Sequence, residues 1–118
     1  MGGRGNRVSE VPWEIIINDA VESDLRALDE SRRQEVLRAL KKVSRNPLPA
    51  SEGGYGKPLG NKSGTNLTGC LKIKLLRLGV RIVYRLKRTE HGMQIIVIGV
   101  RADNEVYRIA DKRLKKME

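Results

Sequence analysis

Apolar and basic side chains alternate along two neighbouring stretches in the middle of the chain. Residues 70–75 read Cys-Leu-Lys-Ile-Lys-Leu and residues 80–85 read Val-Arg-Ile-Val-Tyr-Arg. Alternation at every second residue predicts two antiparallel strands, each with an apolar and a cationic face, joined by a turn around Leu78 and Gly79. A connection of even length brings the two apolar faces together, and the same parity gathers the cations on the opposite face. These cations are Lys72, Lys74, Arg81 and Arg85.

Like charges that face each other across a strand pair repel, so this arrangement contributes nothing to folding by itself. An anionic ligand on the patch is one explanation. The alternative is a solvated sheet face, which is an ordinary environment for Lys and Arg. The strand prediction places no carboxylate of the chain itself within the patch.

Before this hairpin, the pattern predicts one strand and two helices. Residues 13–17 are rich in β-branched side chains, which favours a short strand that is inner or covered. Residues 19–28 repeat apolar side chains at helical spacing, and Asp19 is predicted to start this helix. Ser31 followed by Gln34 has the form of a capping box, so a second helix is expected to begin there.

After the hairpin, residues 93–100 are almost all apolar, which predicts a strand buried on both faces. Asp103 is predicted to cap a final helix whose last turns carry Lys and Arg. Residues 47–69 are rich in Pro, Gly, Ser and Asn and are expected to form a long loop. This loop is expected to place Lys57 and Lys62 beside the cationic face.

These elements predict an α+β fold. We expect a small antiparallel sheet of about four strands with a mixed edge, two N-terminal helices packed on one face and a short C-terminal helix. Residues 1–11 are glycine-rich and are expected to form a flexible leader. Residues 12–118 are expected to form a single domain, because a chain of this size can bury its own core.

The composition of the chain predicts a polyanionic partner. The 118 residues carry a formal net charge of +10, and from Leu71 onward 13 Lys and Arg stand against 5 Asp and Glu. Aromatic residues make up only 3%, so stacking platforms for nucleic acid are scarce. Cys70 and His91 are the only cysteine and histidine, which excludes an intrachain disulfide and a cluster of metal ligands. A single cysteine, with no signal peptide and no spanning segment in the sequence, predicts a cytoplasmic protein.

From about Trp13 to about Arg113 the chain resembles the RelE branch of the RelE/ParE toxin superfamily. The motifs that carry the resemblance are Leu67-Thr68-Gly69, Lys72-Ile73-Lys74-Leu75, Gly79-Val80-Arg81-Ile82-Val83-Tyr84, Gly99-Val100-Arg101 and Glu105-Val106-Tyr107. The resemblance implies a toxin of a bacterial type II toxin-antitoxin pair. It also implies cleavage of messenger RNA held in the ribosomal A site, with no metal or other cofactor.

The resemblance further implies a catalytic surface of two lysines, two arginines and a tyrosine. The matching residues here are Lys72, Lys74, Arg81, Arg101 and Tyr107. Val80 and Cys70 depart from the family pattern, which often has aromatic residues at these two positions. Four further cations are expected to bind substrate, namely Arg85, Lys57, Lys62 and Lys112.

Cleavage of RNA by its own 2′-hydroxyl requires a proton acceptor, cations for the charge of the phosphorane, and a proton donor for the leaving 5′-oxygen. His91 is expected in an exposed turn away from the patch. A lysine among other cations has a lowered pKa, which makes Lys72 or Lys74 a candidate base.

The two arginines and the tyrosine complete this expected chemistry. Arg81 and Arg101 suit phosphate binding, and the resemblance gives Arg101 the role at the leaving group. Tyr107 is expected to orient the 2′-hydroxyl or to share in its deprotonation. The alternative for Tyr107 is an amphipathic anchor of the last helix.

Two other functions fit the same sequence pattern. A ParE-like inhibitor of DNA gyrase would have much the same fold, although that branch does not keep the five catalytic residues as a group. A non-catalytic RNA-binding module would use the basic face to grip phosphates. For the RelE-like function we expect as partners an acidic RelB-like antitoxin, the ribosome and messenger RNA. The antitoxin is expected to cover or displace the C-terminal helix near Tyr107.

Overall fold

The computed structural model of the protein describes residues 11–62 and 65–117, and at residues 61 and 62 it describes the backbone only. The predicted leader, apart from Val11, and the side chain of Lys62 therefore lie outside the described residues. The helices are α1 (Asp19–Arg26), α2 (Glu30–Val43) and α3 (Asp103–Met117). The strands are β1 (Glu14–Ile16), β2 (Lys57–Pro58), β3 (Asn61–Lys62), β4 (Thr65–Asn66), β5 (Cys70–Leu75), β6 (Val80–Lys87) and β7 (Gly92–Gly99).

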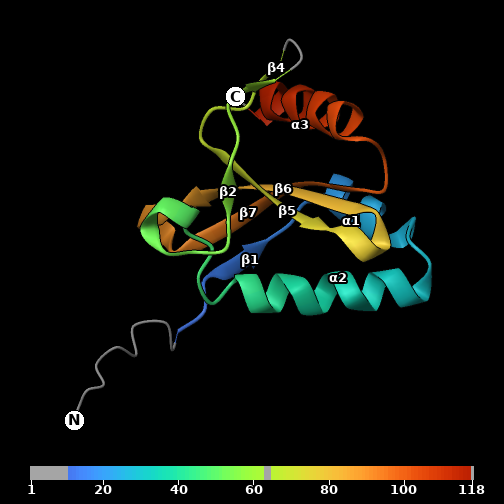
Figure 1. The fold of residues 1–118 in the computed structure, drawn as a ribbon, viewed down its shortest axis with the longest axis horizontal. Coiled ribbons are helices and arrows are strands. Elements are labelled where there is room, and N and C mark those ends of the chain that lie inside the picture. The colour runs from blue at the N-terminus through green and yellow to red at the C-terminus, as the bar shows by residue number, and fades with distance from the viewer. Residues whose placement is uncertain (1–10, 63–64, 118) are drawn as a thin grey trace.

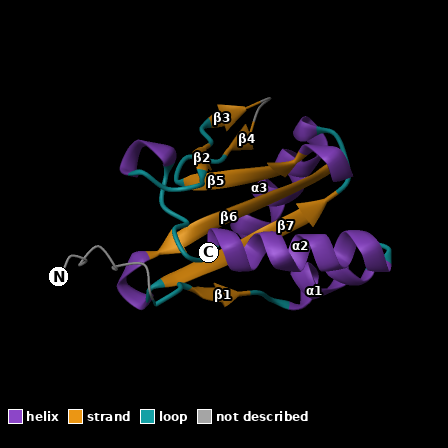
Figure 2. Ribbon diagram, turned by 60° about the horizontal axis from the view of Figure 1, so that its bottom comes forward, coloured by secondary structure: helices purple, strands orange, loops and turns teal. Residues whose placement is uncertain are grey.

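Five of these strands form one sheet in the order β1-β7-β6-β5-β2, visible in Figure 2. Only the pairing of β1 with β7 is parallel within this sheet, so the predicted α+β class and mixed edge are confirmed. The fifth strand is β2, which lies within the stretch predicted to be a loop. That prediction failed at β2 because two residues are too few to show a periodic pattern.

The first strand lies at the edge of the sheet, so of the two predicted alternatives, an inner or a covered strand, the inner one was wrong. β1 has β7 as its single neighbour in the sheet, and Ile17 just beyond it is 39% exposed. A run of β-branched residues fits an edge strand as well as a central one, because composition reports packing on the faces rather than the number of strand partners.

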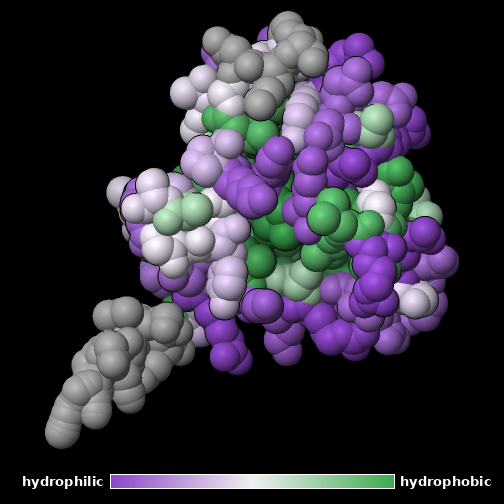
Figure 3. Space-filling model, in the orientation of Figure 1, coloured by the Kyte–Doolittle hydropathy of each residue, from purple (hydrophilic) through white to green (hydrophobic). Residues whose placement is uncertain are grey.

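The helices cover both faces of the sheet. Figure 1 shows α2 on one side of it and α3 on the other. Viewed from the same side, hydrophilic side chains surround the two helical layers, and apolar side chains are visible between them at the level of the sheet (Figure 3). The helices therefore present their polar faces to solvent and bury their apolar stripes against the sheet.

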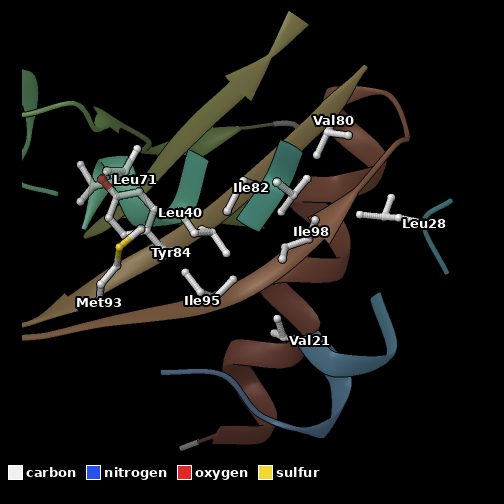
Figure 4. Packing of buried hydrophobic residues seen from close by; sticks show 12 residues of the cluster. Val21, Leu28, Leu40, Leu71, Val80, Ile82, Tyr84, Met93, Ile95 and Ile98 are labelled. Carbon is white, nitrogen blue, oxygen red and sulfur yellow. The ribbon is translucent and has the colours of Figure 1, made fainter. Parts of the chain in front are cut away.

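The larger core lies between the sheet and the two N-terminal helices (Figure 4). Its buried residues are Val21, Leu28, Val36, Leu40, Val43, Leu71, Val80, Ile82, Tyr84, Met93, Ile95 and Ile98. The Tyr84 hydroxyl donates to the carbonyl of Pro47 at 2.8 Å, which satisfies its one polar group within this core. Gly56 passes so close that a Cβ there would lie 2.3 Å from the Tyr84 hydroxyl, so the contact requires glycine.

A second core lies between the opposite face of the sheet and α3. Its buried residues are Leu59, Leu67, Cys70, Val83, Ile96, Val97, Val106, Tyr107 and Ala110. β7 contributes to both cores, which confirms that this strand is buried on both faces. The register between β6 and β7 shifts between Val83 and Tyr84, so that Ile96 is an extra residue and packs in the second core beside Val97.

α1 begins at Asp19 as predicted, whereas the predicted caps of α2 and α3 need correction by one or two residues. Asn18 caps α1, because its side chain accepts from the Val21 N–H at 3.0 Å. Asp29, not Ser31, caps α2, with a bond from the Arg32 N–H at 2.8 Å. Ser, Asp and Asn are all favourable caps, so neighbouring candidates cannot be ranked from sequence. Asp103 is the first residue of α3 rather than its cap.

Among the described residues, no helix has the length and the apolar composition needed to cross a membrane.

Candidate functional site

The pairing of β5 with β6 follows the parity predicted for the hairpin. Leu71 pairs with Tyr84, and Lys74 pairs with Arg81. The turn residue Gly79 has φ of 69°, a left-handed conformation that costs glycine little. The alternating apolar side chains of the two strands, such as Leu71, Ile82 and Tyr84, thus lie in the core beside α2. The cations are directed to the opposite face. At the sheet edge Lys57 pairs with Lys72, which places a further lysine on this cationic face.

A carboxylate occupies the space between the central two cations. Lys74 Nζ lies 2.9 Å from Asp103 Oδ2, and Arg81 Nε donates to Oδ1 of the same side chain. Arg81 also donates through Nη1 to the carbonyl of Arg101 at 3.0 Å. Hydrogen bonds from Lys74 and from Arg81 hold the pKa of the Asp103 carboxyl below its usual value, although partial burial acts in the opposite direction.

The expectation that the patch contains no carboxylate of its own was therefore wrong. Asp103 comes 29 residues after Lys74 and 22 after Arg81, on a different element. The strand pattern describes only the hairpin, and it carries no information about which residue of α3 packs above it. The net charge of this part of the patch is accordingly lower than the hairpin alone suggests.

The other central lysine is paired with the predicted tyrosine. Lys72 Nζ donates to the Tyr107 hydroxyl at 3.2 Å and lies 5.8 Å from the centre of the tyrosine ring. Tyr107 is only 4% exposed, and its ring belongs to the second core while its hydroxyl meets the cationic face. The side chain is thus both the anchor of α3 and a polar member of the site.

Arg85 lies toward the far end of the same face. Its Nε donates to Gln94 Oε1 at 2.7 Å, and Nη2 lies 3.9 Å from the sulfur of Met117. Across the strand pair it faces Cys70, a buried thiol whose pKa is raised by burial and lowered to a smaller extent by the charge of Arg85. Gln94 could not be recognised from sequence, because it stands alone in an apolar strand.

Arg101 and Lys112 line a neighbouring cavity of about 460 Å³ along α3, together with Thr65 of β4. Glu105, Arg108 and Ile109 line it with them, at the helical spacing of one face. Tyr107 points from the same helix to the sheet. Arg101 therefore joins the central patch through its carbonyl, which accepts from Arg81, and it also lines this second space.

The structure thus brings four of the five predicted catalytic side chains into one row beneath α3. They are Lys72, Lys74, Arg81 and Tyr107. Of the four predicted substrate-binding residues, Lys57 extends the row and Arg85 continues it, while Lys112 lines the cavity next to Arg101. The side chain of Lys62 lies outside the described residues.

The position of α3 above this row is held by an ion pair to α1. Arg113 donates to both carboxylate oxygens of Asp24, at 2.7 and 3.0 Å, and to the carbonyl of Ile96 at 2.9 Å. Asp24 also accepts from the backbone N–H of Ile98 at 3.0 Å. Neither partner was singled out from the sequence, where both look like ordinary charged residues on helix surfaces.

His91 lies away from the row, as predicted. It is an exposed turn residue with φ of 53°, and its ring stacks on Trp13 at 4.3 Å between ring centres. Within residues 11–62 and 65–117, no group of three or more His, Cys, Asp or Glu could hold a metal ion.

Comparison with known proteins relates this fold to a family. No protein-family model matches the chain. Over 103 residues it is 26% identical to an Escherichia coli protein named as a RelE-like toxin, a match that covers 87% of this chain and 98% of that protein.

Two solved structures show the same arrangement of helices and strands. The toxin-antitoxin complex RelBE2 of Mycobacterium tuberculosis is similar at 25% identity and a TM-score of 0.63, over 80% of this chain and 97% of that one. The isolated RelE toxin of E. coli is similar at 24% identity and a TM-score of 0.61, over 86% and 98%.

The mixed sheet between two helical layers, with a cationic row beneath the last helix, defines a RelE-like α+β fold. The comparisons of sequence and structure confirm the resemblance to the RelE branch of the RelE/ParE toxin superfamily.

Proposed function

We propose that this protein is the toxin of a type II toxin-antitoxin pair and a ribosome-dependent endoribonuclease that cleaves messenger RNA in the A site. The observation that carries the proposal is the row of Lys72, Lys74, Arg81 and Tyr107, which gathers from three elements onto one face. The similarity of this chain to proteins named as RelE toxins supports the toxin role.

In the proposed reaction the 2′-hydroxyl of the RNA attacks the adjacent phosphorus. The new O–P bond forms while the bond from phosphorus to the next 5′-oxygen breaks, which leaves a cyclic phosphate and a free 5′-hydroxyl. One proton passes from the 2′-hydroxyl to an acceptor, and another is delivered to the leaving oxygen. The site must also stabilise the additional negative charge of the phosphorane.

Lys74 and Arg81 suit the binding of this charge. Both already converge on the two oxygens of a single carboxylate, and a guanidinium with an ammonium fits two phosphate oxygens in the same way. Lys72 and Tyr107 form the hydrogen-bonded pair next to them, so the proton of the 2′-hydroxyl is assigned to this pair. Arg101 has the role at the leaving oxygen, which the family resemblance implies.

Such a site depends on the ribosome for its rate. Lys, Arg and Tyr have ordinary pKa values far above neutrality, so proton transfer to and from them is inefficient at neutral pH. Exact placement of the reacting atoms by a bent codon in the A site supplies the missing acceleration. Translated message is therefore the substrate, and naked RNA is cleaved poorly.

An acidic, RelB-like antitoxin is the proposed partner of the silent toxin. The chain carries a net charge of +10, which suits an acidic peptide as well as RNA. The similar structure from M. tuberculosis is that of a toxin-antitoxin complex, which supports a partner of this kind. The proposed location is the cytoplasm, where ribosomes and translated message are present.

Primer extension on a translated message, after induction of the protein, tests this function. Wild type is expected to produce cuts within codons of the translated message and few cuts in the same RNA without ribosomes. Arg101→Ala is expected to reduce cutting by about 100-fold, because a group that acts at the leaving oxygen typically contributes at least this much. Arg88→Ala is the matched control, because Arg88 is an exposed arginine paired with Glu52 on the protein surface.

The same experiment separates the rival functions. Equal cleavage of naked and translated RNA contradicts ribosome dependence. Absence of any cut, with RNA binding retained, favours the RNA-binding module. Growth arrest without cleavage, accompanied by inhibition of DNA gyrase, favours the ParE-like function.

A further inference from the structure

The Asp103 carboxylate is bound in the way that a substrate anion would be bound. Each of its oxygens has its own cation, Lys74 at Oδ2 and Arg81 at Oδ1. Among the residues that the structure describes, no other carboxylate contacts Lys72, Lys74 or Arg81. The charge repulsion predicted for the hairpin is thus relieved from within the chain.

A phosphodiester offers two non-bridging oxygens, each of which accepts hydrogen bonds from Lys or Arg as a carboxylate oxygen does. The two anions cannot both take the same donors of Lys74 and Arg81. RNA that reaches these donors must therefore displace the Asp103 carboxylate. Rotation of the Asp103 side chain alone is enough to free the donors.

We infer that the Asp103 side chain marks the subsite of the scissile phosphate and competes with RNA for Lys74 and Arg81. This inference rests on the proposed function, because it takes single-stranded RNA as the ligand of the site. In the free protein, Asp103 is a competing anion, and it lowers the affinity of the cationic row for RNA.

Two observations favour a competitor over a catalytic base, and two more show that the side chain can leave the site. Both oxygens of Asp103 are already engaged by cations, and the pKa of its carboxyl is lowered by Lys74 and Arg81, which makes it a weak proton acceptor. Its side chain is 38% exposed, so it can rotate into solvent. α3 itself stays in place meanwhile, because buried Val106 and the ion pair of Arg113 hold the helix.

The test is the affinity for a short single-stranded RNA with 2′-O-methyl groups, which cannot be cleaved, measured by fluorescence anisotropy at fixed salt. Asp103→Asn keeps the shape of the side chain but removes its charge. It is expected to bind this RNA about 5- to 10-fold more tightly than wild type, because Lys74 and Arg81 lose a charged competitor but keep a neutral one. Asp103→Glu keeps the charge and is expected to bind within about 2-fold of wild type.

Two controls separate local competition from net charge. Glu22→Gln makes the same change of charge on α1, at an exposed residue beside Arg26, and is expected to bind within about 2-fold of wild type. In an Arg81→Ala background, Asp103→Asn is expected to improve binding by less than about 2-fold, because one donor of the contested pair is already absent. Thermal unfolding of each variant shows that the compared proteins are folded.

Titration with inorganic phosphate provides an independent measurement. The NMR signal of the Arg81 side-chain Nε–H is expected to shift at lower phosphate concentration in Asp103→Asn than in wild type. If this variant binds RNA and phosphate no more tightly than wild type, or if Glu22→Gln improves binding equally, the inference is overturned.

Failure of the proposed function looks different. If wild type cleaves translated message while Asp103→Asn gains no affinity, only the competition is wrong. If no cleavage occurs but Asp103→Asn still gains affinity for the RNA and for phosphate, the nuclease function is wrong and the anion subsite stands.

Discussion

The two faces of the central sheet meet opposite demands. The face toward α1 and α2 is apolar throughout its interior, and Ile82, Tyr84 and Ile95 there are fully buried. The face toward α3 is apolar only around residues such as Val83 and Ile96, and the remainder carries the cationic row. The first face stabilises the fold by burial, whereas the second brings like charges together at a cost that Asp103 reduces.

This difference shows where the protein's stability and its proposed activity are located. One strand, β6, contributes alternately to both faces, so neighbouring residues can be changed with separate consequences. Substitutions toward α2 are expected to affect folding, and substitutions toward α3 are expected to affect the chemistry. The following predictions test this separation, beginning with the largest effect.

Ile82→Ala is expected to lower the free energy of unfolding by about 3–4 kcal/mol, because it leaves a cavity in a fully buried core. Denaturant unfolding measures the change. Ile17→Ala, at a residue that is 39% exposed, is the control and is expected to cost less than about 1 kcal/mol. Equal losses at the two positions would show that the α2 face is not the main source of stability.

Arg81 is next to Ile82 in the chain but lies on the other face of the sheet. Arg81→Ala is therefore expected to reduce activity strongly and stability little. Cleavage of translated message should fall by about 100-fold, because a donor to the phosphate is lost. The free energy of unfolding should change by less than about 1 kcal/mol, since the removed cation was both paired with Asp103 and repelled by Lys74. Arg88→Ala again serves as the control of equal charge. A large loss of stability in Arg81→Ala would contradict the separation of the two faces.

Arg113→Ala is expected to lower the free energy of unfolding by about 2 kcal/mol, because it leaves Asp24 without its charged partner in a mostly buried position. Arg38→Ala breaks an exposed pair with Glu35 and should cost no more than about 0.5 kcal/mol. In Arg113→Ala, the backbone amides of α3 should be less protected from hydrogen exchange than in wild type. Unchanged protection of α3 would mean that its apolar face alone holds it to the sheet.

The smallest expected effect is the pH dependence contributed by Asp103. Because its pKa is lower in the folded protein than in the unfolded chain, its ionised form stabilises the fold above the unfolded pKa. That contribution is lost as the pH falls through the folded pKa. The stability difference between wild type and Asp103→Asn should therefore be largest near neutrality and should fade below about pH 4. Unfolding curves at several pH values measure it, and a difference that grows in acid would contradict the ion pairs.

Much of the fold could be predicted from the sequence, because the relevant patterns are local. The alternation in residues 70–85 predicted the hairpin and the faces of its side chains, and the apolar run at 93–100 predicted a strand buried on both faces. The helices themselves followed from periodicity. The cap of α2 lies at Asp29, two residues before the predicted Ser31, because several good capping residues stand together.

The candidate site was predicted in part. The motifs named Lys72, Lys74, Arg81 and Tyr107, which the structure places in one row. They did not indicate Asp103 within the patch, the bond of Arg85 to Gln94, or the separate cavity that Arg101 lines. Each of these depends on how α3 and β7 meet the hairpin, and no local pattern reports a contact between distant segments.

The sequence by itself determined which side chains of the hairpin share a face, because the two-residue period of a strand leaves only one register that buries the apolar set. It also determined that the other face is cationic. Only the tertiary structure decided what lies against those cations, since the packing of α3 through Val106, Tyr107 and Arg113 brings Asp103 between Lys74 and Arg81.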